Sequence, residues 1–323
     1  MRHRSLPRAA VAAALAGTLA ITLSAQGGRG TSANLQQAQQ ALRDGRGKDA
    51  VAAARLELGA NPASTQAANL LDLLGMTADA RTAFKRAIDA ASDPAAKATT
   101  QRAMAVSYAF DGDCTNAIKF EQMALDYWVT RETAEPQKAF YQEGEVANEA
   151  ARICIDAGKL DQADTWYRKG YDLGMKEPAP KTHPKSLWDF RLAHALGRLA
   201  ARRGNAAEAQ KQIAAARQAL DSDPAMAALQ QERFFPYLVG YVALYTNDLA
   251  KAETELKKTT EMTGNTTDPF MLCLLGMTYE KAGKKAEATA TYQKVLGLAT
   301  NHNPPSAFAR PFVRKKLGLS IPS

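Results

Sequence analysis

Seven turn positions recur along the chain, and each has small residues at the same distances before and after it. Six of the turn residues are glycine and one is asparagine, the types that most readily adopt the left-handed conformation ending a helix. Helices approach closely only where side chains are small, so this arrangement predicts a helical hairpin around each turn. The turns are Gly45, Gly75, Gly112, Gly158, Gly204, Asn247 and Gly283; the alanines five residues later are Ala50, Ala80, Ala117, Ala163, Ala209, Ala252 and Ala288; the small residues seven positions earlier are Ala38, Ala68, Ala105, Ala151, Gly197, Gly240 and Gly276.

Larger residues also recur at fixed distances from the turns, and the last copy carries the fullest set. That copy contains Leu272, Leu275, Gly276, Tyr279, Gly283, Ala288 and Tyr292. These spacings resemble those of the tetratricopeptide-repeat (TPR) family, in which W-x₂-L-G-x₂-Y is followed by A-x₃-F and then P. The resemblance extends over residues 31–302. It implies an all-α fold, a right-handed α-solenoid of about seven TPR-like helical hairpins plus a C-terminal capping helix.

The distance between successive turns varies from 30 to 46 residues, whereas the family period is about 34. The extra length is expected between hairpins. Residues 175–186 contain three prolines and predict a loop, and the helices around 115–131 and 136–157 are expected to be longer than usual. A closing helix is expected at about 306–317, within a capping segment of residues 303–323, because a solenoid has to cover its last apolar face.

The N-terminus has the layout of a secretory signal peptide. Three arginines without an acid precede the apolar stretch 9–23, and the small residues Ser24 and Ala25 follow. We therefore expect residues 1–25 to be a signal peptide, residues 26–31 to be a flexible leader, and the protein to be exported to the periplasm or secreted. An uncleaved N-terminal anchor is the alternative, and it would be the only contact with a membrane.

Composition and motifs favour a non-enzymatic protein without a cofactor or a metal site. The GRGKD stretch from Gly45 to Asp49 lacks the first glycine of a phosphate-binding loop and the hydroxyl residue that would hold Mg²⁺. The four histidines show no metal-ligand spacing, and no G-x-S-x-G motif occurs. Removal of residues 1–25 lowers the formal net charge from +8 to +5 with basic residues dispersed, which argues against nucleic-acid binding.

The resemblance implies that the first helix of each hairpin lines a concave surface where ligands bind. Positions that share this face on the fourth to seventh hairpins include several arginine and aromatic residues, which bind carboxylates and supply contact area, so a groove centred on these hairpins is predicted. The predicted partner is therefore a peptide or protein, with an acidic one favoured. The candidate partner-binding residues are Arg152, Arg191, His194, Arg198, Arg202, Phe234, Tyr237, Tyr241 and Tyr245. The alternative interpretation is that the aromatic residues pack between hairpins and that the arginines pair with neighbouring acids.

Two of the three cysteines are expected near each other. Cys114 opens the second helix of one hairpin, and Cys154 lies near the end of the first helix of the next. In stacked antiparallel hairpins these two ends are close, so an exported chain could join them in a disulfide; two unpaired buried thiols are the alternative.

These observations lead to one functional hypothesis and one alternative. The first is a non-enzymatic scaffold or adaptor that binds a peptide or protein on its concave face in the cell envelope. The alternative is an accessory subunit or substrate-binding module of an envelope enzyme or assembly complex.

Overall fold

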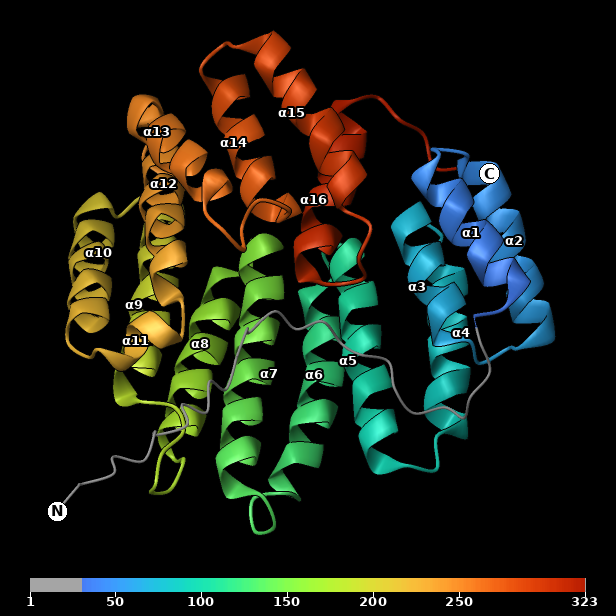
Figure 1. The fold of residues 1–323 in the computed structure, drawn as a ribbon, viewed down its shortest axis with the longest axis horizontal. Helices are drawn as coiled ribbons and strands as arrows, with labels where there is room; N and C mark the ends of the chain where they lie inside the picture. Colours follow the sequence, from blue (N-terminus) through green and yellow to red (C-terminus); the bar gives the residue numbers. More distant parts are fainter. Residues whose placement is uncertain (1–30, 323) are drawn as a thin grey trace, which may run out of the picture.

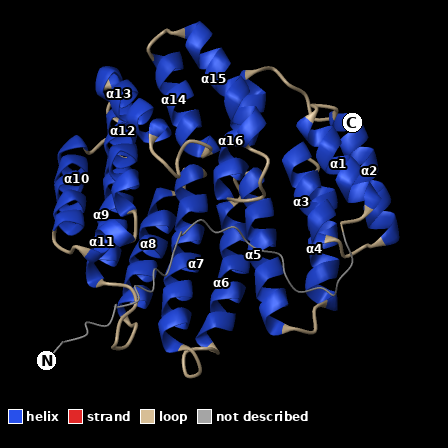
Figure 2. Ribbon diagram, viewed as in Figure 1, coloured by secondary structure: helices blue, strands red, loops and turns tan. Residues whose placement is uncertain are grey.

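The computed structural model describes residues 31–322, and this part of the chain consists of helices, turns and loops without a strand (Figure 2). The predicted signal peptide and all but the last residue of the predicted leader lie outside the described residues. The helices are α1 (Ala33–Arg43), α2 (Gly47–Ala60), α3 (Thr65–Leu74), α4 (Thr77–Ala90), α5 (Pro94–Phe110), α6 (Cys114–Val129), α7 (Pro136–Asp156), α8 (Leu160–Met175), α9 (Lys185–Arg202), α10 (Ala206–Asp221), α11 (Ala225–Ala228), the 3₁₀ helix η1 (Gln231–Phe234), α12 (Phe235–Tyr245), α13 (Leu249–Glu261), α14 (Pro269–Lys281), α15 (Lys285–Leu298) and α16 (Pro304–Lys316).

The seven predicted turns are all present. Each predicted turn residue has a positive φ, between 65° at Asn247 and 87° at Gly75. The left-handed conformation is strained for most residue types, but asparagine tolerates it, which explains why one turn can do without glycine. The hairpins are α1–α2, α3–α4, α5–α6, α7–α8, α9–α10, α12–α13 and α14–α15.

The small residues lie where the two helices of each hairpin meet. All seven alanines that follow the turns are buried. A Cβ added to Gly240 would lie 2.7 Å from Leu256 Cγ, and one added to Gly276 would lie 2.6 Å from Tyr292 Cε1. Leu256 and Tyr292 stand nine residues after their turns, so the glycine of one helix makes room for the large residue of the other.

The hairpins follow one another along an arc (Figure 1). The second helix of each hairpin packs against the first helix of the next, as α2 does against α3 and α8 against α9. The predicted all-α solenoid is therefore confirmed. Of the expected insertions, the loop between α8 and α9 spans residues 176–184, and α7 is the long helix that was expected, with 21 residues. The expected lengthening of α6 is wrong, because its 16 residues match those of α8 and α10.

One insertion differs from the prediction. Residues 222–234, between α10 and α12, contain the short helix α11 and the 3₁₀ helix η1. Phe234 therefore ends η1 and does not lie on the first helix of the sixth hairpin, as its spacing had suggested. Pro236 at the start of α12 fits this boundary, because proline is best tolerated in the first turn of a helix.

The C-terminal helix does more than cover the last hairpin. α16 packs against α14 and α15 as expected, and it also contacts α3, α5 and α7 (Figure 1). In the tail that follows α16, Ile321 lies within about 3.3 Å of a Cβ built on Gly75, and Pro322 lies against Gly47 at the start of α2. The two ends of the array are thus joined, and the solenoid is closed on itself.

None of the helices within residues 31–322 combines the length and the apolar character that a membrane span requires.

Candidate functional site

We call the surface formed by the first helices α7, α9, α12 and α14 the inner face. It carries eight of the nine candidate partner-binding residues, and η1 carries the ninth, Phe234. Four candidates are buried: His194, Arg198, Tyr237 and Tyr241. Five are partly buried: Arg152, Arg191, Arg202, Phe234 and Tyr245.

Arg198 lies at the centre of the buried group and is only 7% exposed. Its guanidinium donates hydrogen bonds to the hydroxyl of Tyr167 (2.9 Å) on α8 and to that of Tyr237 (3.0 Å) on α12. The Tyr241 ring lies 5.9 Å away. Arg198, Tyr237 and Tyr241 thus hold α8, α9 and α12 together with their polar atoms inside the protein, and their expected role in partner binding stays a prediction.

His194 belongs to the same buried group. Its ring lies 5.0 Å from that of Tyr237 and 5.7 Å from that of Phe190. Burial, together with the positive charge of Arg198, holds the pKa of His194 well below its usual range. The imidazole is therefore neutral at physiological pH and packs as an aromatic ring; its expected contact with a partner stays a prediction.

The partly buried arginines of α7 and α9 lie beside acids. Arg191 forms an ion pair with Glu145 of α7, and Arg152 Nε lies 3.9 Å from Asp156 Oδ2 on the same helix. Both guanidinium groups also lie over aromatic rings, at 5.0 Å from the Trp188 ring for Arg191 and 4.6 Å from the Phe270 ring for Arg152. The inner face is therefore a surface of mixed charge, closer to the alternative interpretation than to a purely basic groove.

Arg202 and Tyr245 form the part of the inner face next to α14. The Arg202 guanidinium donates to the Tyr241 hydroxyl (3.3 Å) and lies 4.9 Å from the centre of the Tyr245 ring. Lys281 of α14, which is exposed, has its Nζ 5.8 Å from the same ring. Among the described residues no acid lies within ion-pair distance of Arg202, and its guanidinium donates to the Tyr241 hydroxyl.

A buried acid of α6 and its neighbouring acid on α7 were missed by the sequence analysis. Glu121 is completely buried, and its burial together with nearby Glu149 raises its pKa well above the usual range. Glu149 in turn forms an ion pair with Arg102 of α5 at 2.6 Å. Glu121 stands nine residues after its turn, where most other copies have an aromatic or aliphatic residue, and this departure was the available indication.

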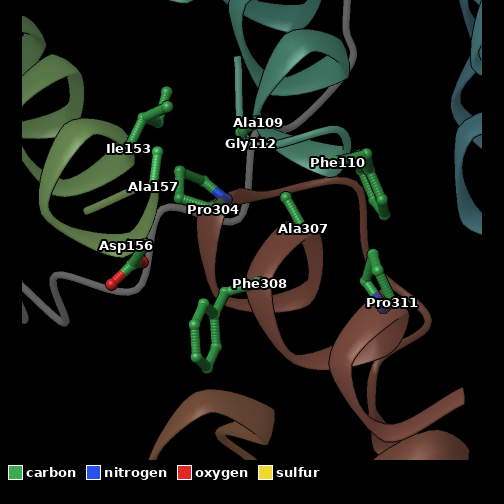
Figure 3. Close-up of a pocket in the computed structure, with 10 residues that line it drawn as sticks. All are labelled: Ala109, Phe110, Gly112, Ile153, Asp156, Ala157, Pro304, Ala307, Phe308 and Pro311. Atoms are coloured by element: carbon green, nitrogen blue, oxygen red, sulfur yellow. The ribbon is translucent and has the colours of Figure 1, made fainter. Parts of the chain in front are cut away.

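A cavity of about 150 Å³ lies between α5, α7 and α16 (Figure 3). The figure shows Ile153, Asp156 and Ala157 on the side of α7, and Pro304 and Phe308 on the side of α16. Burial raises the pKa of Asp156 to about 6, even though three neighbouring arginines oppose that shift. The cavity therefore has apolar walls and one titratable group at its border.

Cys114 and Cys154 form a disulfide in the structure, with Cα atoms 4.8 Å apart. It ties the start of α6 to the end of α7, just behind the wall of the cavity formed by Gly112 and Ile153. Cys273 is a free, buried cysteine of α14. Within residues 31–322, no three side chains of histidine, cysteine, aspartate or glutamate are grouped to hold a metal ion.

Residues 271–302 match the family model described as tetratricopeptide repeat. This segment comprises most of α14, the turn at Gly283 and α15, the copy in which the repeat spacing is fullest. The seventh hairpin therefore matches a tetratricopeptide repeat. The other six hairpins carry the same left-handed turns and buried small residues.

Two solved structures are similar to this chain, and both are described as tetratricopeptide-repeat structures. One is a tetratricopeptide repeat protein from Parabacteroides merdae, with 15% identity, a TM-score of 0.42, and coverage of 81% of this chain and 90% of that chain. The other is the TPR domain of P58(IPK), with 12% identity, a TM-score of 0.31, and coverage of 81% and 91%. No curated protein matches the sequence.

Proposed function

We propose that this TPR protein is a non-catalytic scaffold of the cell envelope that binds a peptide or protein partner through the partly buried residues of its inner face. The observation that carries the proposal is the arrangement of Arg152, Arg202 and Tyr245. They come from three different hairpins, and rings of the protein support the two guanidinium groups. A stacked guanidinium is held in place while its N–H edge remains able to bind a carboxylate.

Carboxylates are the partner groups that fit this arrangement best. Among the described residues Arg202 forms no ion pair with an acid, and Arg152 Nε is a buried donor without a hydrogen-bond partner, 3.9 Å from Asp156 Oδ2. The exposed Lys281 adds positive charge nearby. The proposed partner is therefore a segment that presents acidic side chains to α7, α9 and α14, with Tyr245 in contact with its apolar atoms.

Export is proposed on two grounds. The signal-peptide layout of residues 1–25 is the first. The second is the disulfide between Cys114 and Cys154, since disulfides persist in oxidising compartments and are rare in the cytosol. The mass of the protein isolated from the envelope fraction tests this: loss of about 25 residues is expected, and a full-length cytosolic chain would contradict it.

Photo-crosslinking tests the inner face directly. A photoreactive phenylalanine at Tyr245, used in cells of the native organism, is expected to form a defined adduct with one protein. The double substitution Arg152→Glu/Arg202→Glu should reduce that adduct at least about tenfold, because it reverses two charges that meet the partner. Arg168→Glu is the matched control, since Arg168 lies on α8, is exposed and pairs with Asp164.

The control should leave the adduct unchanged. An adduct that survives the double substitution, or the absence of any defined adduct at Tyr245, would reject the inner face as the binding surface.

A further inference from the structure

The contact that joins the two ends of the array has a polar side and an apolar side. We call the contact of residues 302–322 with α1–α7 the closing contact. Outside the closing contact, α16 packs against the last hairpin: the Phe308 ring lies 5.0 Å from that of Phe270, and the Phe312 ring lies 5.9 Å from that of Tyr292. The closing contact itself combines buried polar groups with apolar packing, since Ala307 belongs to the core of the N-terminal hairpins and the His302 ring lies 5.5 Å from that of Phe84.

The first polar group of the closing contact is a buried pair. His302 Nε2 lies 2.8 Å from Asp72 Oδ2, and Asp72 also accepts a hydrogen bond from Ser107 at 2.9 Å. Burial nevertheless raises the pKa of Asp72, because the desolvation of this carboxyl outweighs the hydrogen bond and the charge interaction with His302, which lower the pKa. Such a pair fixes the geometry of a contact while adding little net stability.

The second polar group is Arg310, a buried cation without an acidic partner. Its guanidinium donates to the backbone carbonyl of Leu73 at the end of α3, and to those of Leu296 (3.2 Å) and Ala299 (3.0 Å). Burial lowers its pKa to about 10. The carbonyls satisfy the donors, but a buried charge that lacks a counter-charge opposes the closed arrangement.

Packing across the closing contact is also incomplete. The cavity of about 150 Å³ lies within it, between Ala307, Phe308 and Pro311 on α16 and the ends of α5 and α7 (Figure 3). Side chains around a cavity lose dispersion contacts that a filled core would provide. Beyond α16, the tail contributes Leu319 and Ile321, which remain 44% and 58% exposed.

From these contacts we infer that the array opens and closes at the closing contact, with α16 moving together with the last hairpin away from α3, α5 and α7. Opening widens the inner face and uncovers the ends of α5 and α7, including Asp156 and the adjoining Arg152. The closed arrangement thus limits how a bulky partner reaches the proposed binding residues. The biological meaning rests on the proposed function, whereas the opening itself is measurable without a partner.

Two buried thiols in one full-length chain report the motion. Ala307, which is 2% exposed, lines the cavity, so a cysteine there fits and becomes reactive only on opening. Cys273, buried in α14, reacts only if the last hairpin unfolds. In Ala307→Cys, the introduced thiol should react with N-ethylmaleimide at least about a hundredfold faster than Cys273. Equal rates would overturn the inference, because they would mean that α16 and the last hairpin open only by unfolding.

Arg310→Ala in the Ala307→Cys chain should raise the rate at position 307 at least about tenfold and leave Cys273 unchanged, since the one hydrogen bond from this charged group across the closing contact, to the Leu73 carbonyl, is lost and that carbonyl is left without its partner. Lys315→Ala removes the same charge from an exposed position of α16 and should change neither rate. If Arg310→Ala accelerates both thiols equally, or neither, the closing contact is not the site of opening. The comparison of the two thiols in the chain with Arg310 intact does not depend on the folding of this variant.

A disulfide that holds the closing contact closed allows this inference and the proposed function to be tested separately. A Cβ on Gly47 would lie 3.0 Å from Pro322 Cβ, so a small outward shift of the tail brings two cysteines at these positions to the Cβ separation of about 3.5–4.5 Å found in disulfides. The oxidised Gly47→Cys/Pro322→Cys chain should give at least about tenfold less of the Tyr245 photo-adduct than the unlocked chain. An equal yield in both chains would show that closing does not limit the partner's access to the inner face, and it would leave the proposed function standing. No adduct in either chain would reject the proposed function alone.

Discussion

The repeat spacing can be tested by adding one methyl group at two glycines of the last hairpin. At Gly276 of α14, the new Cβ would lie 2.6 Å from Tyr292 Cε1 and 2.8 Å from Cδ1. The Tyr292 ring cannot move away easily, because it is buried and its hydroxyl donates to Glu280 at 2.9 Å. Overpacking of this kind costs about 1–3 kcal/mol, and the better helix propensity of alanine recovers about 0.5–1 kcal/mol. Gly276→Ala should therefore lower the free energy of unfolding by about 1–2 kcal/mol.

Gly297 of α15 provides the matched control, because nothing lies within 4 Å of a Cβ built there. Gly297→Ala should raise the free energy of unfolding by about 0.5–1 kcal/mol. Urea unfolding followed by circular dichroism measures both, with midpoints that shift in opposite directions at unchanged slope. Adding Tyr292→Leu should relieve about 1 kcal/mol of the cost of Gly276→Ala. Shifts of the same sign for the two glycine variants would refute the inference that the small residues are required by helix contact.

Three further predictions concern other parts of the molecule. Glu121→Gln should match the wild type in stability at pH 4 and exceed it at pH 7. The reason is that a carboxyl whose folded pKa is raised stabilises the fold below its unfolded pKa, and this contribution is lost as the pH rises through the folded pKa. Equal urea midpoints of the two proteins at pH 7 would contradict this. Replacing Cys114 and Cys154 by serine should lower the free energy of unfolding by about 2–4 kcal/mol, since the disulfide closes a loop across 40 residues; insensitivity of the wild-type urea midpoint to reductant would argue against the bond. Asp268→Ala should cost about 1 kcal/mol in the same assay, because Asp268 caps two backbone N–H groups at the start of α14; no loss would show that the cap is dispensable.

The hairpins could be predicted from the sequence because their determinants are local. Gly158 and Ala163, for example, lie five residues apart and define the same turn whatever surrounds them. The insertion that places Phe234 in η1 could not be placed in this way. Its 13 residues lack a repeat spacing, and their position depends on distant contacts, such as the hydrogen bond from the Asn265 side chain to the carbonyl of Arg233.

The candidate site was only partly predictable for a related reason. Helical spacing correctly brought Arg198, Tyr237 and Tyr241 to one face, but spacing does not give the depth of a side chain. Arg198 is buried because the hydroxyl of Tyr167, on the second helix of the preceding hairpin, completes its hydrogen bonds. Arginine on an exposed face and arginine between hairpins have the same spacing, and only the packing of neighbouring hairpins distinguishes them.

The closing contact fixes the number of hairpins in this protein. In an open solenoid each repeat touches only its neighbours, so a lineage can gain or lose a repeat and still fold. Here one extra hairpin between α4 and α14 would carry His302 and Arg310 past Asp72 and the end of α3, and leave both buried groups without their partners. We therefore expect natural relatives that keep these residues to vary in loop length while holding the repeat count at seven.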